Sequence, residues 1–255
     1  MKSLRTARLT EMEEYIIEHE HVRLDTLAKV FNISLNTVRR DIDEIIQNGK
    51  VSKVYGGVTS NVQPNKLISY NIRYEKQAQL KDIIAKKASS FIQDNDTIFL
   101  DSGSTTVHIM KYISHVKDLI VVTNNMAILE IYKNNIHENM KLILLPGEYN
   151  LNTNSIVGGI PSNYMLNYNF SKCFMAATAL SSSGDVTNSS VDEFQIKKNA
   201  LLKSDSTFLL IDSSKYDNAS FLTYANIAEF NYIVSDKAPA DYINLYSKST
   251  NFIIA

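Results

Sequence analysis

Seven short apolar runs in the chain from about residue 75 onward constrain the fold more than any other feature. They are TIFLD, LIVVT, KLILLP, KCFMAA, STFLLID, YIVSD and NFIIA. Amphipathic stretches lie between several of them, as in QLKDIIAKKASSFI, TVHIMKYI and SVDEFQIKKNALL. Apolar strands that alternate with helices are typical of a parallel sheet covered by helices on both faces. The sequence therefore predicts a mostly parallel α/β domain in this part of the chain.

The N-terminal part of the chain has a different pattern, with three short helices and a hairpin. Apolar residues recur at helical spacing from Leu4 to His19 and again in RLDTLAKVF. Ser34 is a suitable N-cap for a third helix, which Gly49 would end. Two short helices joined by a tight turn are typical of a helix-turn-helix, and KVSKVYGGVTS predicts a small β-hairpin beside them. Together these elements predict a winged helix-turn-helix.

The third predicted helix carries its apolar and polar residues on opposite faces. Asn36, Thr37 and Arg40 point away from the core, and Arg39 flanks the apolar face. The second helix of a helix-turn-helix presents its first residues to base edges, and Asn and Arg suit adenine and guanine. A solvated charged face would have the same pattern, so periodicity leaves DNA binding and a structural role both open. The face expected in the core consists of Leu35, Val38, Ile42, Ile45 and Ile46.

Composition narrows the class of protein. The formal net charge is -1, so any DNA binding must come from a local patch rather than from a general basic excess. Cys173 is the only cysteine, which excludes an internal disulfide and a cysteine-based zinc site, and its apolar neighbours favour a buried side chain. No apolar run is long enough to span a bilayer, and the N-terminus has no apolar signal-peptide core. We therefore expect a cytoplasmic protein.

A small polar loop, DSGSTT, follows the first apolar run of the α/β part. Its residues Ser102 to Thr106 would stand at a helix N-terminus, where backbone amides and hydroxyls can bind an anion. It is not a Walker loop, because the Gly-Lys-[Ser/Thr] ending is absent. The next strand ends in Thr123, Asn124 and Asn125, and the carboxyl ends of parallel strands converge on one crevice. An ordinary capped loop fits the same spacing, so the residues alone leave an anion site and a structural loop both open.

Several motifs resemble the DeoR family of bacterial transcription regulators. TVRRD and YGG have the spacing of that family's N-terminal signature, and YNIRYEKQAQLKDIIAKKASSFIQDNDTIFLDSGSTT resembles its junction into the effector domain. The resemblance covers essentially the whole chain. It implies a winged helix-turn-helix at residues 3–58, a linker at 59–75 and an α/β effector domain at 76–255. The effector domain would resemble ribose-phosphate isomerase and glucosamine-phosphate deaminase folds, which implies a repressor of carbohydrate metabolism controlled by a phosphorylated sugar or polyol.

The same resemblance implies roles for individual residues, with double-stranded operator DNA and the effector as partners. No catalytic residue, metal or cofactor is expected. We expect a homo-oligomer, because a single winged helix on a near-neutral chain offers only a small contact surface to DNA. Without the resemblance, Glu193 and Lys197 would read as an ordinary i,i+4 surface ion pair. The expected DNA contacts are Ser34, Asn36, Thr37, Arg39, Arg40, Lys53 and Tyr55. The expected effector contacts are Asp101, Ser102, Gly103, Ser104, Thr105, Thr106, Thr123, Asn124, Asn125, Glu193, Lys197, Asp212 and Lys215.

The chain departs from the family pattern in three places. Ala176 and Ala179 stand where paired glycines are usual, and Glu148 stands where a second glycine is usual. Side chains there would narrow the site, and an acid would repel a phosphate dianion unless it faced away. Effector identity therefore stays open, as does loss of effector binding. The rival interpretation is a sugar-phosphate isomerase or deaminase with a DNA-binding appendage, using Asp101, Glu193, Asp212 and Lys197.

Overall fold

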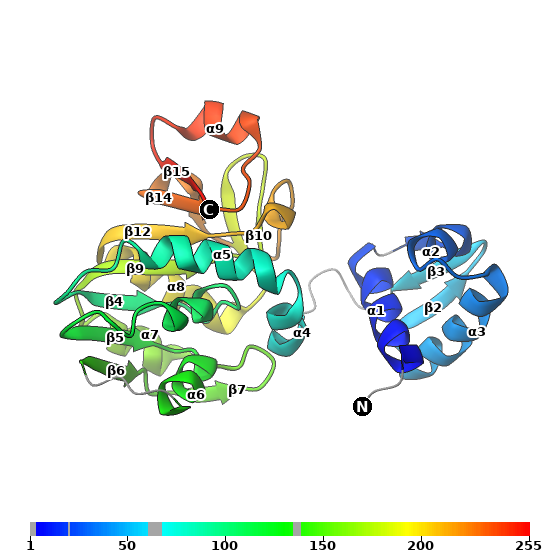
Figure 1. Ribbon diagram of the computed structural model, residues 1–255, viewed down its shortest axis with the longest axis horizontal. Coiled ribbons are helices and arrows are strands. Elements are labelled where there is room, and N and C mark those ends of the chain that lie inside the picture. Colours follow the sequence, from blue (N-terminus) through cyan, green and yellow to red (C-terminus); the bar gives the residue numbers. More distant parts are fainter. Residues whose placement is uncertain (1–3, 20, 61–67, 135–138) are drawn as a thin grey trace. The chain divides into compact units, whose positions relative to one another are not determined.

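The chain divides into two compact units, residues 1–66 and 67–255 (Figure 1). The computed structural model describes residues 4–19, 21–60, 68–134 and 139–255. The range expected as a linker, 59–75, contains the end of strand β3 (Gly57–Ser60) and all of helix α4 (Tyr70–Glu75), which belongs to the second unit. Residues 61–67 of that range lie outside the described residues, as does residue 3.

The first unit combines helices with a small antiparallel sheet, as the sequence predicts. Ser34 caps α3 with its side chain, which accepts a hydrogen bond from the Thr37 amide. The hairpin of β2 and β3 is present, and β1 adds a third strand that the sequence did not predict, in the order β1-β3-β2. A Cβ on Gly57 would lie 2.4 Å from the Val22 carbonyl oxygen, so this close strand pairing requires glycine. The remaining elements are α1 (Leu4–His19), β1 (His21–Arg23), α2 (Leu24–Val30), α3 (Leu35–Ile45), η1 (Ile46–Asn48) and β2 (Val51–Val54).

The core of the first unit forms where the apolar spacing places it, with one exception. Met12, Ile16, Leu27, Val38 and Ile42 are buried together. The expectation for Leu35 is wrong, because its side chain is 44% exposed at the first turn of α3. The first residue of this helix lies beyond the edge of the core, so the sequence periodicity places the start of the buried face one turn too early.

The second unit contains a seven-stranded parallel sheet, and each of the seven apolar runs supplies one of its strands (Figure 1). The predicted mostly parallel α/β domain is confirmed. The strand order is β15-β14-β12-β9-β4-β5-β6, and every neighbouring pair is parallel. The strands are β4 (Thr97–Leu100), β5 (Leu119–Thr123), β6 (Met140–Leu144), β9 (Phe170–Ala176), β12 (Ser204–Leu210), β14 (Tyr232–Ser235) and β15 (Asn251–Ile254).

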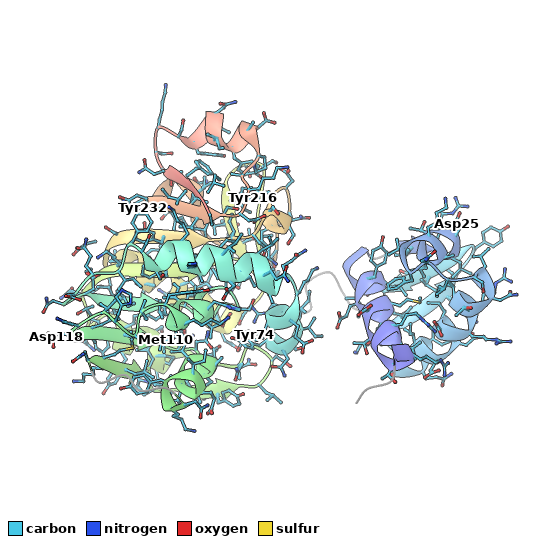
Figure 2. The ribbon with its side chains drawn as sticks, viewed as in Figure 1. Asp25, Tyr74, Met110, Asp118, Tyr216 and Tyr232 are labelled. Atoms are coloured by element: carbon cyan, nitrogen blue, oxygen red, sulfur yellow. The ribbon has the colours of Figure 1, made fainter. Side chains whose placement is uncertain are left out.

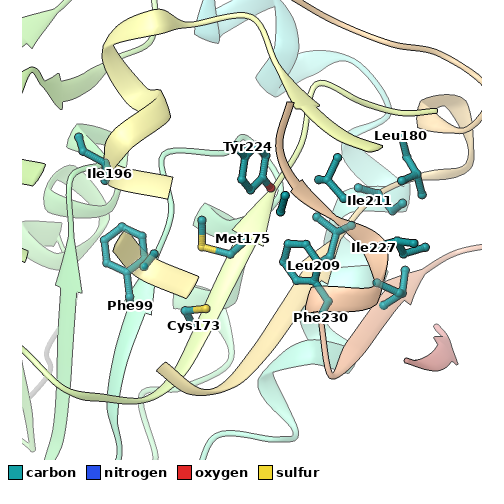
Figure 3. Close-up of a cluster of buried hydrophobic side chains, with 14 of the residues drawn as sticks. Phe99, Cys173, Met175, Leu180, Ile196, Leu209, Ile211, Tyr224, Ile227 and Phe230 are labelled. Carbon is teal, nitrogen blue, oxygen red and sulfur yellow. The ribbon is translucent and has the colours of Figure 1, made fainter. Parts of the chain in front are cut away.

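Helices cover both faces of this sheet, because successive strand residues point to opposite sides. Ile98 and Leu100 of β4 pack with α5 (Ala78–Ser89), η2 (Thr106–Lys111) and α6 (Met126–Asn134). Phe99 lies on the other face in a second cluster, which α7 (Gly159–Met165) and α8 (Val191–Leu202) cover (Figure 3). Cys173 belongs to this second cluster, as expected, and burial raises the pKa of its thiol to about 12.

Smaller elements complete the second unit. The expected helix in TVHIMKYI is a 3₁₀ helix of six residues, η2, rather than an α-helix. Two antiparallel sheets flank the main one, in the orders β7-β8 and β10-β11-β13. No helix in the described ranges is long and apolar enough to cross a membrane. The added elements are β7 (Glu148–Asn150), β8 (Ser155–Val157), β10 (Ala179–Leu180), β11 (Asp185–Asn188), η3 (Ser213–Lys215), β13 (Leu222–Asn226), η4 (Ile227–Glu229) and α9 (Ala240–Tyr246).

Candidate DNA-binding surface and sensor pocket

Helix α3 presents an exposed polar face at its N-terminal half. Asn36, Arg39 and Arg40 are exposed, as the sequence predicts. Within the described residues, neither arginine forms an ion pair or donates a side-chain hydrogen bond to the protein. Asp41, the acid that follows them, is buried and accepts from Arg8 Nε at 2.9 Å, which ties α3 to α1. Arg39 and Arg40 are thus exposed to solvent, whereas the neighbouring Asp41 forms a buried contact within the unit.

The other expected DNA contacts have more varied surroundings. The Ser34 hydroxyl serves as the N-cap and lies 2.9 Å from the Thr37 hydroxyl, so both side chains also hold the first turn of α3. Lys53 on β2 forms an exposed ion pair with Asp43. Tyr55 is fully exposed at the turn between β2 and β3. The helix and the hairpin therefore both carry exposed polar groups in this unit.

The pocket of the second unit lies where the direction of the chain through the sheet reverses. Strands β4, β5 and β6 follow one another outward on one side of β4, and β9 lies on its other side. Ligand sites in parallel sheets form outside the carboxyl ends of the strands at such a switch point. Here a small pocket is lined by Arg73, Ser102, Gly103, Ala176, Ala177, Thr178, Asn188, Glu193 and Lys197.

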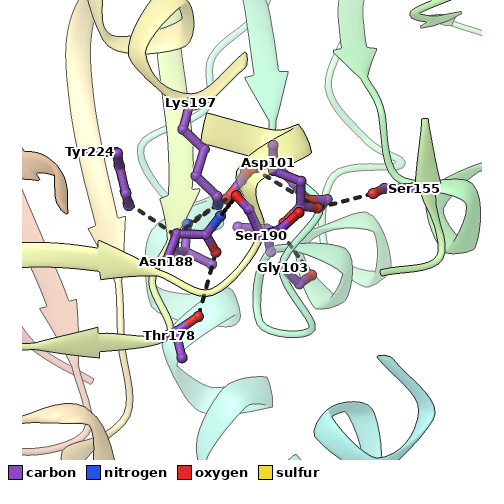
Figure 4. A network of polar contacts seen from close by, with 12 residues as sticks. Asp101, Gly103, Ser155, Thr178, Asn188, Ser190, Lys197 and Tyr224 are labelled. Atoms are coloured by element: carbon purple, nitrogen blue, oxygen red, sulfur yellow. Dashed lines mark hydrogen bonds and ion pairs between the residues drawn. The ribbon is translucent and has the colours of Figure 1, made fainter. Parts of the chain in front are cut away.

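A buried ion pair between Asp101 and Lys197 lies at this switch point (Figure 4). Lys197 Nζ lies 2.5 Å from Asp101 Oδ2 and also donates to the Ala176 carbonyl oxygen at 3.1 Å. The same carboxylate oxygen accepts from the Ala176 amide at 3.0 Å, so it joins the ends of β4 and β9. Tyr224 donates its hydroxyl to the Ala176 carbonyl oxygen at 3.0 Å, and burial raises the pKa of this tyrosine. Asp101 therefore has its charge matched inside the protein.

Glu193 is the second buried carboxylate of the pocket. Its Oε1 atom accepts from the Ser102 hydroxyl at 2.5 Å and from the Ser155 hydroxyl at 3.0 Å. No cationic side chain lies within ion-pair distance of it among the described residues. The i,i+4 ion pair between Glu193 and Lys197, which helical spacing alone would suggest, is not formed, because Lys197 pairs with Asp101 instead.

The DSGSTT loop is buried, yet four consecutive backbone amides in it have no acceptor among the residues that the structure describes. Within the described part of the chain, the N–H groups of residues 102–105 donate no hydrogen bond to protein, although Ser102, Ser104 and Thr105 are each at most 6% exposed. Buried amides are almost always bonded to protein, water or ligand. The six-residue 3₁₀ helix η2 replaces the expected α-helix, so the amides and not a helix dipole carry the potential for anion binding.

Of the expected effector contacts, Ser102, Gly103, Glu193 and Lys197 line this pocket and the others do not. The Thr106 hydroxyl donates to the Asp101 and Gly103 carbonyl oxygens, and Asn125 Nδ2 donates to the same two atoms. Thr123 donates to the Leu100 carbonyl oxygen, and Asn124 donates to Ile156. Asp212 accepts from the Ser214 amide as the N-cap of η3, the element that contains Lys215. These side chains shape the loop and the neighbouring strand ends.

The three departures from the family pattern have different consequences. Ala176 lines the pocket, and a Cβ on Gly103 would lie 2.3 Å from the Ala176 Cβ, so these two positions cannot both carry a side chain. Ala179 is buried in β10 outside the pocket lining. Glu148 is exposed on β7 and does not line the pocket. Only Ala176 therefore narrows this pocket.

Arg73 is the main pocket residue that the sequence did not predict. It lies on α4, in a segment whose polar composition and proline favour a linker. The helical spacing of Tyr70 and Tyr74, which stack on each other at 6.0 Å, is the signal that could have revealed this helix. Asn188 and Ser155 were also missed, because single polar residues between strands have no pattern of their own. The described residues contain no cluster of His, Cys, Asp or Glu side chains that could hold a metal ion.

Comparison with known proteins agrees with both units. The model of the DeoR-like helix-turn-helix domain matches residues 8–63, and that of the DeoR C terminal sensor domain matches residues 76–237. The HTH-type transcriptional regulator IolR of Bacillus subtilis is 37% identical over 243 residues, covering 95% of this chain and 96% of the relative. The lactose phosphotransferase system repressor of Streptococcus mutans is 30% identical over 247 residues, covering 96% and 98%. A ribose 5-phosphate isomerase structure from Plasmodium falciparum matches with 19% identity and a TM-score of 0.39, over 54% of this chain and 52% of that one. The chain belongs to the DeoR family of transcriptional regulators.

Proposed function

We propose that the protein is a repressor of a carbohydrate-metabolism operon whose affinity for DNA is controlled by a phosphorylated sugar or polyol. It acts in the cytoplasm, where the operator is accessible. The relatives named as lactose phosphotransferase system repressors support the carbohydrate role. The observation that carries DNA binding is the exposed face of α3, on which Arg39 and Arg40 have no ion-pair partner among the described residues.

The two arginines have different roles in this proposal. Arg40 points away from the core and reads a guanine edge, for which a bidentate contact discriminates by about 1–3 kcal/mol. Arg39 lies nearer the body of the domain and binds a DNA phosphate, together with Lys53 and Tyr55 on the hairpin. DNA would displace Asp43 from Lys53, at small cost because exposed ion pairs contribute little to stability.

The effector site is the pocket at the ends of β4 and β9. The unbonded amides of residues 102–105 supply donors for phosphate oxygens, which requires no catalytic group. Glu193 and Asn188 line the same pocket and offer polar groups to sugar hydroxyls. Ala176 restricts its size, which favours a small phosphorylated sugar.

The protein acts as a homo-oligomer in this proposal. A single winged helix on a chain of net charge -1 offers a small, weakly charged contact. Two copies bind two half-sites with multiplied affinity. A monomer that bound its operator tightly would contradict this part.

The DNA-binding claim is tested with an operator that the protein selects from a random-sequence DNA pool. Arg40→Ala should lower affinity for that operator about 5- to 150-fold and relax the sequence preference. Arg39→Ala is the matched variant, and it should weaken binding to all sequences and reduce the salt dependence without changing the preference. Unchanged preference and affinity in a folded Arg40→Ala variant would contradict base reading by this residue.

The effector claim is tested with paired phosphorylated and plain sugars by thermal shift on the same protein. Only phosphorylated compounds should stabilise it, and Thr105→Asp should abolish the effect by repelling phosphate, whereas the uncharged Thr105→Asn should retain most of it. Equal stabilisation by plain sugars would contradict the proposal. Product analysis of the same samples tests the enzyme alternative, which Glu193 keeps open as a buried carboxylate in the pocket, and turnover would favour that alternative.

A further inference from the structure

Arg73 projects from the first described helix of the sensor unit into the pocket. Its Nε atom donates to the Ile68 carbonyl oxygen at 3.1 Å, and its guanidinium lies 5.6 Å from the centre of the Tyr70 ring. These two contacts hold the side chain, which lines the pocket together with Ser102 and Gly103. No carboxylate lies within ion-pair distance of this guanidinium in the described ranges. Arg73 is therefore a positioned cation without a matching anion in the described part of the chain.

Lys197, the cation that the family resemblance places in the site, is in a different situation. Its ammonium group is 2.5 Å from Asp101 and is almost completely buried. An effector phosphate could use this charge only at the expense of the pair with Asp101. Arg73 can bind a phosphate without breaking any ion pair in the described structure, and its planar guanidinium suits bidentate contacts with phosphate oxygens.

A further lysine adds positive charge behind Arg73. Lys81 on α5 is buried and donates its ammonium group to the Arg73 carbonyl oxygen. Burial, and then the nearby charge of Lys215, lowers the pKa of Lys81 to about 8, while Asp212 opposes the shift. Lys81 thus places a positive charge beside the backbone of Arg73, a residue that lines the pocket.

We propose that Arg73 is the phosphate-binding cation of the effector site and that α4 is the element that responds to effector occupancy. This inference rests on the proposed sensor function of the pocket. The phosphate lies between the Arg73 guanidinium and the unbonded amides of the DSGSTT loop, so that binding draws α4 toward that loop.

Helix α4 is suited to such a response because it is short and separately attached. The Tyr70 amide donates to the Asn152 carbonyl oxygen at 2.8 Å. The ring of Tyr74, which is labelled in Figure 2, stacks on His108 with 5.2 Å between the ring centroids. Gln77 adopts a left-handed backbone with a φ of 53°, which separates α4 from α5. The Tyr70 hydroxyl is buried without a hydrogen-bond partner among the described residues. A change at Arg73 can thus alter the helix that directly precedes the sensor sheet in the chain, without unfolding that sheet.

The test compares wild type, Arg73→Gln, Arg73→Lys and the control Lys86→Gln. Lys86 is exposed on α5, so its replacement makes the same change in net charge outside the pocket. The probes are inorganic phosphate and a panel of triose, pentose and hexose phosphates, measured at constant ionic strength. Arg73→Gln should lower the affinity for the tightest-binding probe at least about tenfold, and Arg73→Lys should lower it less. Lys86→Gln should bind the probe with the affinity of wild type.

Hydrogen exchange of residues 70–75 gives the second readout. The probe should protect these amides in wild type and in Lys86→Gln but not in Arg73→Gln. Equal probe affinity of wild type and Arg73→Gln, or unchanged exchange of α4 in probe-bound wild type, would overturn this inference while leaving the sensor function in place. If wild type bound none of the phosphates, the proposed effector function itself would fail. Should Arg73→Gln not fold, Arg73→Lys carries the affinity comparison.

Discussion

Replacing Lys197 by methionine tests the buried ion pair on which the geometry of the sensor pocket depends. The side chains of Lys197 and Asp101 are 3% and 1% exposed, so the substitution leaves a buried carboxylate without its counter-charge. Removing one partner of such a pair costs about 3–5 kcal/mol. For a domain of this size, each kcal/mol corresponds to about 2–4 °C in Tm. We therefore expect the Tm of the sensor unit to fall by about 6–20 °C, measured by circular dichroism on the full chain.

Two further variants separate this effect from a general effect of mutation. Lys198→Met changes the next residue of α8, which is exposed, and should alter stability by no more than about 0.5 kcal/mol. The double variant Asp101→Asn/Lys197→Met removes both charges and should be clearly more stable than the sum of the two single losses predicts. If Lys197→Met lowered the free energy of unfolding by less than about 1 kcal/mol, the view that these charges compensate each other would be refuted. The same holds if the loss in the double variant equalled the sum of the two single losses.

Other expectations follow from single contacts. Asp41→Asn removes the buried carboxylate that binds Arg8 and should destabilise the N-terminal unit by about 1.5–3 kcal/mol in thermal unfolding, whereas a change within about 0.5 kcal/mol would contradict its role. Gly103→Ala should cost about 1–3 kcal/mol in urea unfolding because its Cβ would overlap that of Ala176, and adding Ala176→Gly should restore stability; no recovery would argue against the overlap. Lys81 has a pKa of about 8 in the folded chain against 10.5 in its ordinary state, so the unfolded chain binds more protons between these pH values and stability gains with rising pH there. Lys81→Met should remove that gain in stability. If the stability of variant and wild type depended on pH in the same way, the lowered pKa of Lys81 would not be its cause.

The architecture of both units is largely predictable from the sequence. The seven apolar runs all become strands of one parallel sheet, because the residues of central strands are buried on both faces. The cap at Ser34 and the hairpin after α3 follow from local chemistry that needs no tertiary context. Short elements such as β1 and α4 escaped prediction, since three to six residues show too little periodicity to identify.

The candidate site is less predictable because it depends on strand order. The sequence indicates a crevice at the carboxyl ends of parallel strands, but it does not show that β9 is the neighbour of β4 beside which the pocket lies. The adjacency of β4 and β9 joins residues more than seventy positions apart, such as Asp101 and Ala176, and no local pattern predicts it. For the same reason, helical spacing alone suggests Glu193 as the partner of Lys197, although the ion-pair partner is Asp101 at the end of a distant strand.

The central claim is that one chain couples DNA binding to a phosphorylated sugar, and a single titration tests it most directly. The full-length protein is bound to the operator that it selects from random DNA, and the fluorescence anisotropy of the DNA is followed as phosphorylated sugars and their plain counterparts are added. We expect at least one phosphorylated sugar to change the affinity for the operator and its plain counterpart to leave that affinity unchanged. Arg73→Gln should bind the operator but lose the response. Operator affinity that no phosphorylated sugar changes, or that plain sugars change equally, would contradict the claim.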